Sequence, residues 1–181
     1  MKICIDPGHG MSNRHQNVYD TGAEAAGVTE AAIVMRWANA LRIILMRKGH
    51  LVVRTRVDDS DPCPVSRRDD VASAYKCERM ISLHCNAADG KASGTETFYR
   101  GEDDKEMAVN LTAAVCRVLS TKNRGAKTEK ESQHPSLAVM EFDKCWLVEL
   151  GFIDNTADRE RLLNFQLMID ACNAIADVIT R

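Results

Sequence analysis

The chain has 181 residues, of which 45% are hydrophobic and 28% charged, and its formal net charge is -2. These values are ordinary for a globular protein, so we expect residues 1–181 to form one domain with its own hydrophobic core. A charge so close to zero, without a run of Lys and Arg, argues against a nucleic-acid partner. Charged residues interrupt the longest apolar stretches, so no membrane insertion is expected.

The first strand and the first helix are separated by a long polar segment. Residues 3–5 are apolar and predict a buried strand, which Asp6-Pro7-Gly8 ends. His9 follows in a turn flanked by glycines, which leave space beside its ring. Residues 11–28 have a loop composition. A helix is then predicted from its cap at Thr29 until Lys48-Gly49.

The remaining segments alternate between strand and helix patterns. In chain order they are a strand at 51–53, a helix at 65–75, strands at 80–83 and 95–99, a helix at 107–119, strands at 137–140 and 145–148, and a helix at 165–179. The strand at 95–99 is expected at a sheet edge, and residues 123–136 are expected to be irregular. The alternation predicts an α/β fold with one mostly parallel, twisted sheet of about six strands and helices on both faces.

Cysteine usage and the start of the chain indicate where the protein is made. The seven cysteines show no CxxC spacing; they are Cys4, Cys63, Cys77, Cys85, Cys116, Cys145 and Cys172. This pattern predicts reduced, buried thiols rather than disulfides or a thiolate zinc site. Met1 and Lys2 lead directly into the first strand, so we expect synthesis in the cytoplasm without a signal peptide.

Four ionisable residues occupy equivalent places in the predicted topology. His9 follows the first strand, Glu30 opens the first helix, His84 ends the third strand and Glu149 follows the last strand. Because the carboxyl ends of parallel strands and the starts of the next helices meet at one edge, these side chains are expected to converge. Two imidazoles and a carboxylate around an open position make a catalytic zinc site. The remaining carboxylate would then act as the general base.

Simpler interpretations compete with a zinc site. Glu30 lies where an acidic residue favours the helix dipole, and His84 is equally well explained as a hydrogen-bonded histidine at a strand end. Glu149 is harder to explain, because a carboxylate within an apolar run is costly without a partner. Three further residues are rival candidates. Glu24 could be the ligand in place of Glu30, Glu141 could be a second carboxylate in the cleft or a solvated turn residue, and His15 is the third rival. His50 and His134 are expected to be structural or exposed.

Four sequence blocks occur in an order that resembles a known family. They are Asp6-Pro7-Gly8-His9-Gly10, the acidic helix start at Glu30, Ser82-Leu83-His84-Cys85-Asn86-Ala87 and residues 147–155, with lesser matches at 94–99 and Arg124-Gly125. Together they resemble the catalytic domain of zinc-dependent N-acetylmuramoyl-L-alanine amidases of type 3, found in bacterial autolysins, cell-separation amidases and phage endolysins. The resemblance covers essentially the whole chain.

By this resemblance His9, Glu30 and His84 would bind one Zn²⁺ per chain, and Glu149 would be the catalytic carboxylate. The implied reaction is hydrolysis of the amide that joins the lactyl group of N-acetylmuramic acid to L-alanine in peptidoglycan. Zinc would polarise the amide carbonyl and activate water, and Glu149 would carry the water proton to the leaving amine. Asn86 is a candidate for orienting the substrate.

The chain departs from the family's pattern in three ways. The long segment 11–28 leaves Glu24 as an alternative ligand, and Cys85 stands where the family usually has a small residue without a thiol. We interpret Cys85 as a packing residue. The lack of a signal peptide and of a wall-binding domain favours a phage or prophage endolysin that reaches the cell wall at lysis, and a fragment of a larger amidase is the alternative. Other candidate functions are a zinc peptidase or deacetylase acting on another amide, and an inactive peptidoglycan-binding module.

Overall fold

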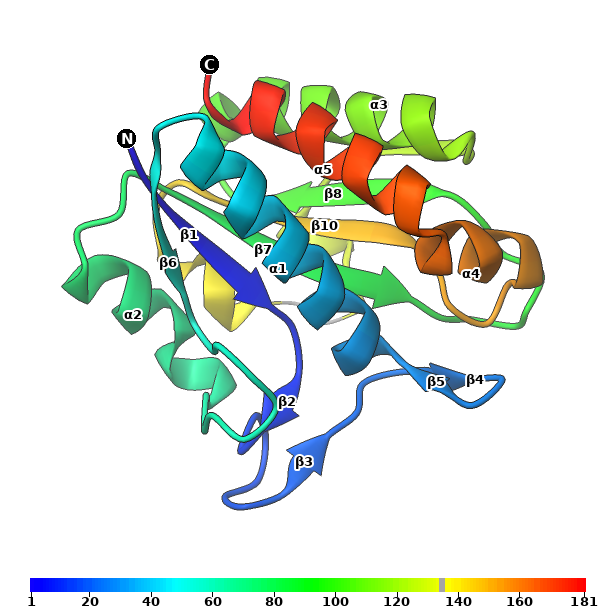
Figure 1. The fold of residues 1–181 in the computed structure, drawn as a ribbon, viewed down its shortest axis with the longest axis horizontal. Coiled ribbons are helices and arrows are strands. Elements are labelled where there is room, and N and C mark those ends of the chain that lie inside the picture. Colours follow the sequence, from blue (N-terminus) through cyan, green and yellow to red (C-terminus); the bar gives the residue numbers. More distant parts are fainter. Residues whose placement is uncertain (134–135) are drawn as a thin grey trace.

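The computed structural model describes residues 1–133 and 136–181, and its centre is a six-stranded sheet (Figure 1). The strands lie in the order β6 (Leu51–Arg54), β1 (Lys2–Pro7), β7 (Arg79–Asn86), β10 (Cys145–Phe152), β8 (Thr95–Tyr99) and β9 (Asn123–Thr128). Neighbouring strands run parallel except for β10 and β8. The predicted α/β class, with a mostly parallel sheet of about six strands, is confirmed.

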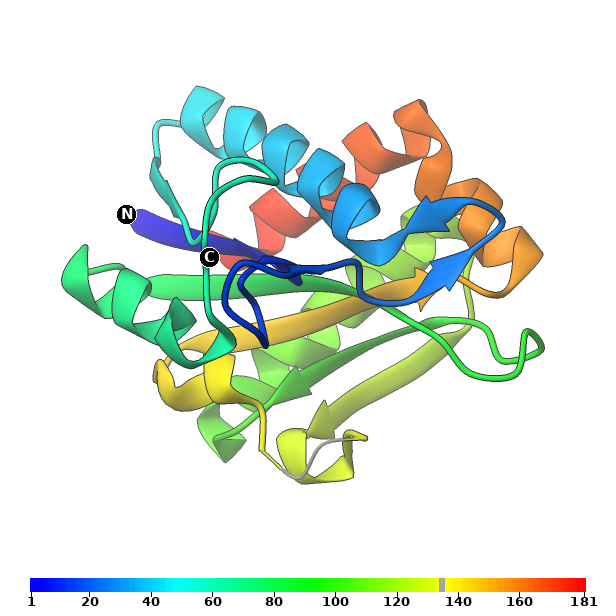
Figure 2. The ribbon, with the colours of Figure 1, turned by 90° about the horizontal axis from the view of Figure 1, so that it is seen from below.

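Helices cover both faces of this sheet (Figures 1 and 2). One face carries three long helices, with the last packed between the other two: α1 (Glu30–Arg47), α3 (Lys105–Leu119) and α5 (Phe165–Ile179). The other face is covered by shorter elements, including the 3₁₀ helix η1 (Val65–Arg67), α2 (Arg68–Ala74) and the 3₁₀ helix η4 (Ala138–Glu141). Two further 3₁₀ helices, η2 (Glu102–Asp104) and η3 (Glu129–Glu131), lie in connecting segments. The predicted helices therefore all form.

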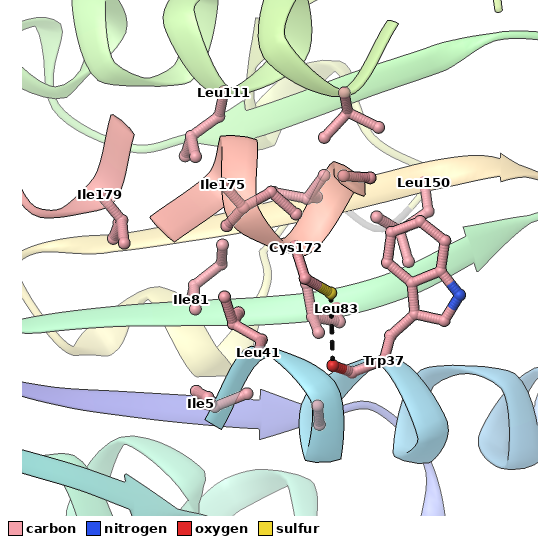
Figure 3. Packing of buried hydrophobic residues seen from close by; sticks show 14 of the residues in the cluster. Ile5, Trp37, Leu41, Ile81, Leu83, Leu111, Leu150, Cys172, Ile175 and Ile179 are labelled. Atoms are coloured by element: carbon pink, nitrogen blue, oxygen red, sulfur yellow. Dashed lines mark hydrogen bonds between the residues drawn. The ribbon is translucent and has the colours of Figure 1, made fainter. Parts of the chain in front are cut away.

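The alternation of side chains along β1 explains the two layers of the core. Ile3 and Ile5 pack into the larger hydrophobic cluster beneath the long helices, whereas Cys4 belongs to a smaller cluster on the opposite face. In the larger cluster, α1 and α5 meet where the Cys172 thiol lies 3.6 Å from the Trp37 carbonyl oxygen (Figure 3). All seven cysteines are buried with free thiols. This packing holds the strand ends, and the residues that follow them, in fixed positions.

Two strand predictions are wrong. The strand at 95–99 is not at an edge, because β8 lies between β10 and β9, and the edges are β6 and β9. Residues 138–140 belong to the 3₁₀ helix η4, which Leu137 precedes, so residues 137–140 are not a strand. The sixth strand is β9, in a segment expected to be irregular. Its pattern is hidden because Arg124 and Lys127 form ion pairs with Glu96 instead of making apolar contacts.

A short helix, α4 (Thr156–Leu163), also escapes prediction. Its sequence is highly polar and buries only Asp158 and Leu162, so no apolar stripe marks it. The Asn155 side chain caps it by accepting the backbone N–H groups of residues 157 and 158. Among the described residues no single helix is long and apolar enough to cross a bilayer; α4 and α5 pass that test only as a pair, which is bent by 79°.

The segment predicted as a long loop contains two small hairpins. The first pairs β2 (Gly10–Met11) with β3 (Tyr19–Asp20), and the second pairs β4 (Glu24–Ala25) with β5 (Val28–Thr29). They carry the chain from β1 to α1, where the Thr29 side chain accepts the Ala32 N–H as predicted for a helix cap. The hairpins lie beside the carboxyl edge of the sheet, where the candidate ligands converge.

Candidate active site

Three predicted ligands meet at the carboxyl edge of the sheet. His9 follows β1, Glu30 is the first residue of α1 and His84 lies near the end of β7. Glu30 Oε1 lies 3.0 Å from His9 Nε2 and 2.9 Å from His84 Nδ1. The two imidazole rings meet edge to face, with centroids 5.0 Å apart. One potential ligand atom from each residue lies within 4.8 Å of the others, so this group could hold a metal ion.

Two glycines leave the space that this convergence needs. A Cβ on Gly8 would collide with the His84 ring. A Cβ on Gly22 would lie 2.6 Å from Glu30 Oε2 and 2.7 Å from His9 Cδ2, and Gly22 has a φ of +67° that favours glycine. His9 itself has a φ of 60°, which is strained for a residue with a side chain. This strained residue lies where the rings of His9 and His84 both face the Glu30 carboxylate.

The Asp20 carboxylate orients the His9 ring. Asp20 Oδ2 lies 3.1 Å from His9 Nδ1 and accepts a hydrogen bond from Asn13 Nδ2 at 2.6 Å, while Oδ1 accepts the Gly22 N–H at 2.9 Å. Burial raises the pKa of Asp20, but these hydrogen bonds outweigh it and lower the pKa to about 2. An ionised partner on Nδ1 directs Nε2 of His9 toward Glu30. Asp20 is not among the predicted site residues, because it reaches His9 only through the β2–β3 hairpin.

Backbone donors hold the Glu30 carboxylate in place. Oε1 accepts the Cys85 N–H at 2.9 Å and Oε2 accepts the Ala23 N–H at 3.0 Å. Burial favours the neutral acid, but the two histidines outweigh it and hold the pKa of Glu30 well below its usual range. The rival Glu24 is exposed on the β4–β5 hairpin. The structure therefore brings Glu30 and not Glu24 to the histidines.

Two buried arginines hold the turn that carries His9. Arg68 donates to the carbonyl oxygens of His9 at 2.7 Å and Pro7 at 2.9 Å. Arg56 donates to the carbonyl oxygens of Pro7 at 3.0 Å and Gly8 at 2.9 Å. Both arginine side chains are almost completely shielded from solvent. The two arginines satisfy backbone carbonyl groups where the chain leaves β1, so the turn that carries His9 is held in place.

Glu149 lies beside the three-residue group, on the next strand. It is the register partner of His84 between β10 and β7. Its Oε2 atom is shielded from solvent and has no hydrogen-bond partner among the described residues. Burial, reinforced by the charges of Glu30 and Glu96, raises the pKa of Glu149 well above its usual range. Such a carboxyl group can take up a proton and release it again during a reaction.

All four predicted residues line one cleft, which has a volume of about 440 Å³. Another part of its wall comes from β8 and β9, which contribute Glu96, Arg124 and Lys127. Asn86 also lines the cleft, and its side-chain amide donates to Glu96 at 2.9 Å. Cys85 is buried, and burial raises the pKa of its thiol well above the usual range, which agrees with its interpretation as a packing residue.

The remaining candidates lie elsewhere. Glu141 is exposed and pairs with Arg100 at 3.0 Å, outside the residues that line the cleft. Its interpretation as a solvated residue is therefore the one that the structure supports. His15 is exposed and His50 is half-buried far from the cleft residues in the turn after α1, while His134 lies outside the described residues.

An α/β sheet with two imidazoles and two carboxylates gathered at its carboxyl edge is typical of a metal-dependent hydrolase. The family model described as N-acetylmuramoyl-L-alanine amidase matches residues 3–181. The chain belongs to this family.

Relatives of known sequence agree with the family assignment. The chain is 30% identical to the YqiI protein of Bacillus subtilis over 186 aligned residues, covering 98% of this chain and 82% of that protein. It is 31% identical to the N-acetylmuramoyl-L-alanine amidase CwlM of Bacillus licheniformis, covering 90% of this chain and 60% of CwlM. It is 30% identical to the amidase LytC of Bacillus subtilis, of which it spans only 34%.

Solved structures share the fold. Cwp6 from Clostridium difficile is 29% identical, with a TM-score of 0.85 over 99% of this chain and 28% of that protein. The catalytic domain of the amidase CwlV from Bacillus (Paenibacillus) polymyxa has the same TM-score at 24% identity, covering 99% of this chain and 96% of that domain, and it supports the fold alone. With the family match, these relatives make the chain an enzyme of the N-acetylmuramoyl-L-alanine amidase class.

Proposed function

We propose that this enzyme uses zinc to hydrolyse the amide between the lactyl group of N-acetylmuramic acid and L-alanine in peptidoglycan. The observation that carries the proposal is the convergence of His9, Glu30 and His84 next to Glu149 in one cleft. Three ligands that leave an open position, with a further carboxylate beside them, are the arrangement of catalytic rather than structural zinc. The family to which the chain belongs supports the choice of bond.

His9 Nε2, His84 Nδ1 and Glu30 Oε1 would hold the zinc ion. This set of two imidazole nitrogens and one carboxylate oxygen suits Zn²⁺, and the Asp20 carboxylate behind His9 holds a proton on Nδ1, which leaves Nε2 to bind metal. When bound, zinc supplies Lewis acidity, which polarises the substrate carbonyl and makes water more acidic.

Glu149 would move the proton that hydrolysis requires. Its carboxylate takes a proton from the attacking water as the water bonds to the carbonyl carbon, and its carboxylic acid then gives this proton to the departing alanine nitrogen. Oε2 has no hydrogen-bond partner in the described part of the chain, which leaves that oxygen available for this exchange. The raised pKa makes the protonated form accessible in the second step.

The test is hydrolysis of purified peptidoglycan by the protein as isolated, after chelation and after zinc is restored. New amino termini and new reducing ends are measured in parallel. We expect release of N-terminal alanine alone, lost on chelation and recovered with zinc. Release of a different amine would indicate another amide substrate. Tight binding to the wall without any release would indicate an inactive binding module.

We further propose that the enzyme is made in the cytoplasm and acts at the cell wall at lysis, as an endolysin. The proposal is supported by a relative, the Endolysin of Bacillus phage SPP1, which is 29% identical over 96 residues, or 53% of this chain. Expression inside a susceptible bacterium should be harmless until the inner membrane is permeabilised, after which the culture should clear within minutes. Clearing of the culture without permeabilisation would contradict the proposal that the enzyme reaches the cell wall only at lysis.

A further inference from the structure

A row of charged side chains crosses the sheet from the candidate metal ligands to the far wall of the cleft. Glu149 on β10 is the register partner of His84 on β7 and, on its other side, of Glu96 on β8. Beyond β8 lies β9, which carries Arg124 and Lys127. These residues point from neighbouring strands into the same cleft.

Glu96 anchors both cations of β9. Its Oε2 accepts a hydrogen bond from Arg124 Nε at 2.7 Å and another from Lys127 Nζ at 2.6 Å, while Oε1 accepts the Asn86 amide. The Glu96 side chain is 4% exposed, whereas those of Arg124 and Lys127 are 28% and 27% exposed. The carboxylate is thus beneath the surface and the two cations face the cleft.

Arg124 and Lys127 share the carboxylate of Glu96, and Lys127 also lies in the field of the Glu131 charge. Glu96 uses the Nε hydrogen of Arg124, and a guanidinium group carries further donors on its Nη atoms. The Cζ atom of Arg124 also lies over the Phe152 ring, 4.9 Å from its centroid, which is a cation–π contact. The nearby Glu131 side chain is held by the backbone N–H and hydroxyl of Thr128. The cluster therefore presents cationic donors that Glu96 does not use to whatever enters the cleft.

We infer that Arg124 and Lys127 bind the free α-carboxylate of the residue that follows L-alanine in the stem peptide. The inference rests on the proposed function and names a specificity subsite for it. Adjacent strands lie about 4.8 Å apart, so donors gathered on Glu96 lie roughly 5–10 Å from Glu149. One extended residue spans roughly 3.5 Å, so L-alanine and the residue after it together reach roughly 7 Å from the scissile amide, which lies within that range.

The matched substrates are N-acetylmuramoyl-L-alanyl-D-isoglutamate and its carboxamide, N-acetylmuramoyl-L-alanyl-D-isoglutamine, which differ in this one group. The wild-type enzyme should cleave the acid with a kcat/KM roughly tenfold higher than the amide, because a charge-assisted hydrogen bond is lost with the amide. Lys127→Met should lower kcat/KM for the acid more than for the amide and so reduce this ratio toward one. Lys127→Arg should restore the ratio.

Lys130→Met is the control, since it removes one positive charge from an exposed position outside the cleft. A purely structural role of Lys127 would lower kcat/KM for both substrates equally and leave their ratio unchanged, which would overturn the inference. The inference would also be overturned if the enzyme preferred the acid only in substrates whose stem peptide carries a free carboxylate on its third residue.

Binding of the two glycopeptides to the Glu149→Gln protein separates this inference from the proposed function. A preference for the acid that Lys127→Met removes would support the subsite even if the wild type cleaved neither compound, in which case the proposed reaction alone would fail. Equal binding of acid and amide, with cleavage of both by the wild type, would leave the proposed function standing and reject the subsite.

Discussion

His9 Nδ1 lies 3.1 Å from Asp20 Oδ2, while Nε2 of the same ring faces Glu30 at 3.0 Å. The imidazole is thus held between two carboxylates, one of which belongs to the candidate metal group and one of which orients the ring. We expect Asp20→Ala to weaken zinc binding about 10- to 100-fold, because the partners that orient metal ligands have effects of this size.

The measurement is the zinc dissociation constant by competition with a chromophoric chelator. Asp143→Ala removes an exposed carboxylate outside the cleft residues and serves as the control. Asp20→Asn keeps an acceptor for the Nδ1 proton and should recover part of the affinity. Equal zinc affinities in wild type and Asp20→Ala would show that the His9 ring does not need this partner.

The choice between Glu30 and Glu24 as a ligand leads to a second prediction. Glu30→Gln should reduce zinc content to near zero under conditions in which the wild type binds one ion, because the neutral amide removes the charge that faces both imidazoles. Glu24→Gln, on the exposed hairpin, should bind zinc normally. Metal content is measured by atomic emission after gel filtration. Loss of zinc in Glu24→Gln and retention in Glu30→Gln would reverse the assignment.

Glu149 should be required for turnover but not for metal. Glu149→Gln is nearly isosteric, so we expect zinc content close to wild type and a fall in kcat of roughly 10²- to 10⁴-fold, the usual contribution of a general acid–base group. Glu141→Gln, whose carboxylate pairs with Arg100 away from the cleft, is the matched control. Release of N-terminal alanine from peptidoglycan gives the rates. Undiminished hydrolysis by Glu149→Gln would remove this residue from the mechanism.

The residues that converge in the cleft are predictable because each lies at a readable element end. Short apolar runs locate the ends of β1, β7 and β10, and a capped amphipathic pattern locates the start of α1. Parallel topology then places His9, Glu30, His84 and Glu149 at one edge without knowledge of any distance.

The supporting residues are not predictable in this way. Asp20 reaches His9 only because a two-residue hairpin folds within an apparently irregular segment. The strand β9 lacks an alternating apolar pattern, since its charged side chains are satisfied by Glu96 across the sheet. Nothing in the local sequence distinguishes the buried Arg68 from the exposed Arg67 beside it. Such residues depend on partners that are distant in sequence.

That neighbouring pair of arginines provides a fourth test, on stability. Arg68 is buried and pairs with Asp6, whereas Arg67 is 72% exposed and pairs with Asp70. Arg68→Met should lower the free energy of unfolding by about 3 kcal/mol or more, because it leaves the buried Asp6 carboxylate without its cation. Arg67→Met should cost at most about 1 kcal/mol. Urea unfolding followed by circular dichroism measures both, and equal losses would contradict the proposed role of the buried pair.

Asp6 also makes stability depend on acid pH. Burial raises the pKa of Asp6, but the Arg68 charge and hydrogen bonds from Ser82 and Thr55 outweigh it and lower the folded-state pKa below its usual value. A depressed folded pKa stabilises the protein above the unfolded pKa of about 3.9, and this stability is lost as the pH falls through the folded value. Wild type should therefore exceed Asp6→Asn in unfolding free energy near neutral pH, and the gap should narrow below about pH 4.

Urea unfolding of both proteins at a series of pH values from neutral to acid measures this gap. Other carboxylates with lowered pKa values, such as Asp20 and Glu30, titrate in both proteins and cancel in the difference. Asp143→Asn, at an exposed position, should follow wild type throughout. A difference between wild type and Asp6→Asn that stays constant with pH would mean that folding does not shift the pKa of Asp6, and a difference that shrinks as the pH rises would mean that Asp6 is neutral in the folded protein. Either result would contradict an ion pair between Asp6 and Arg68.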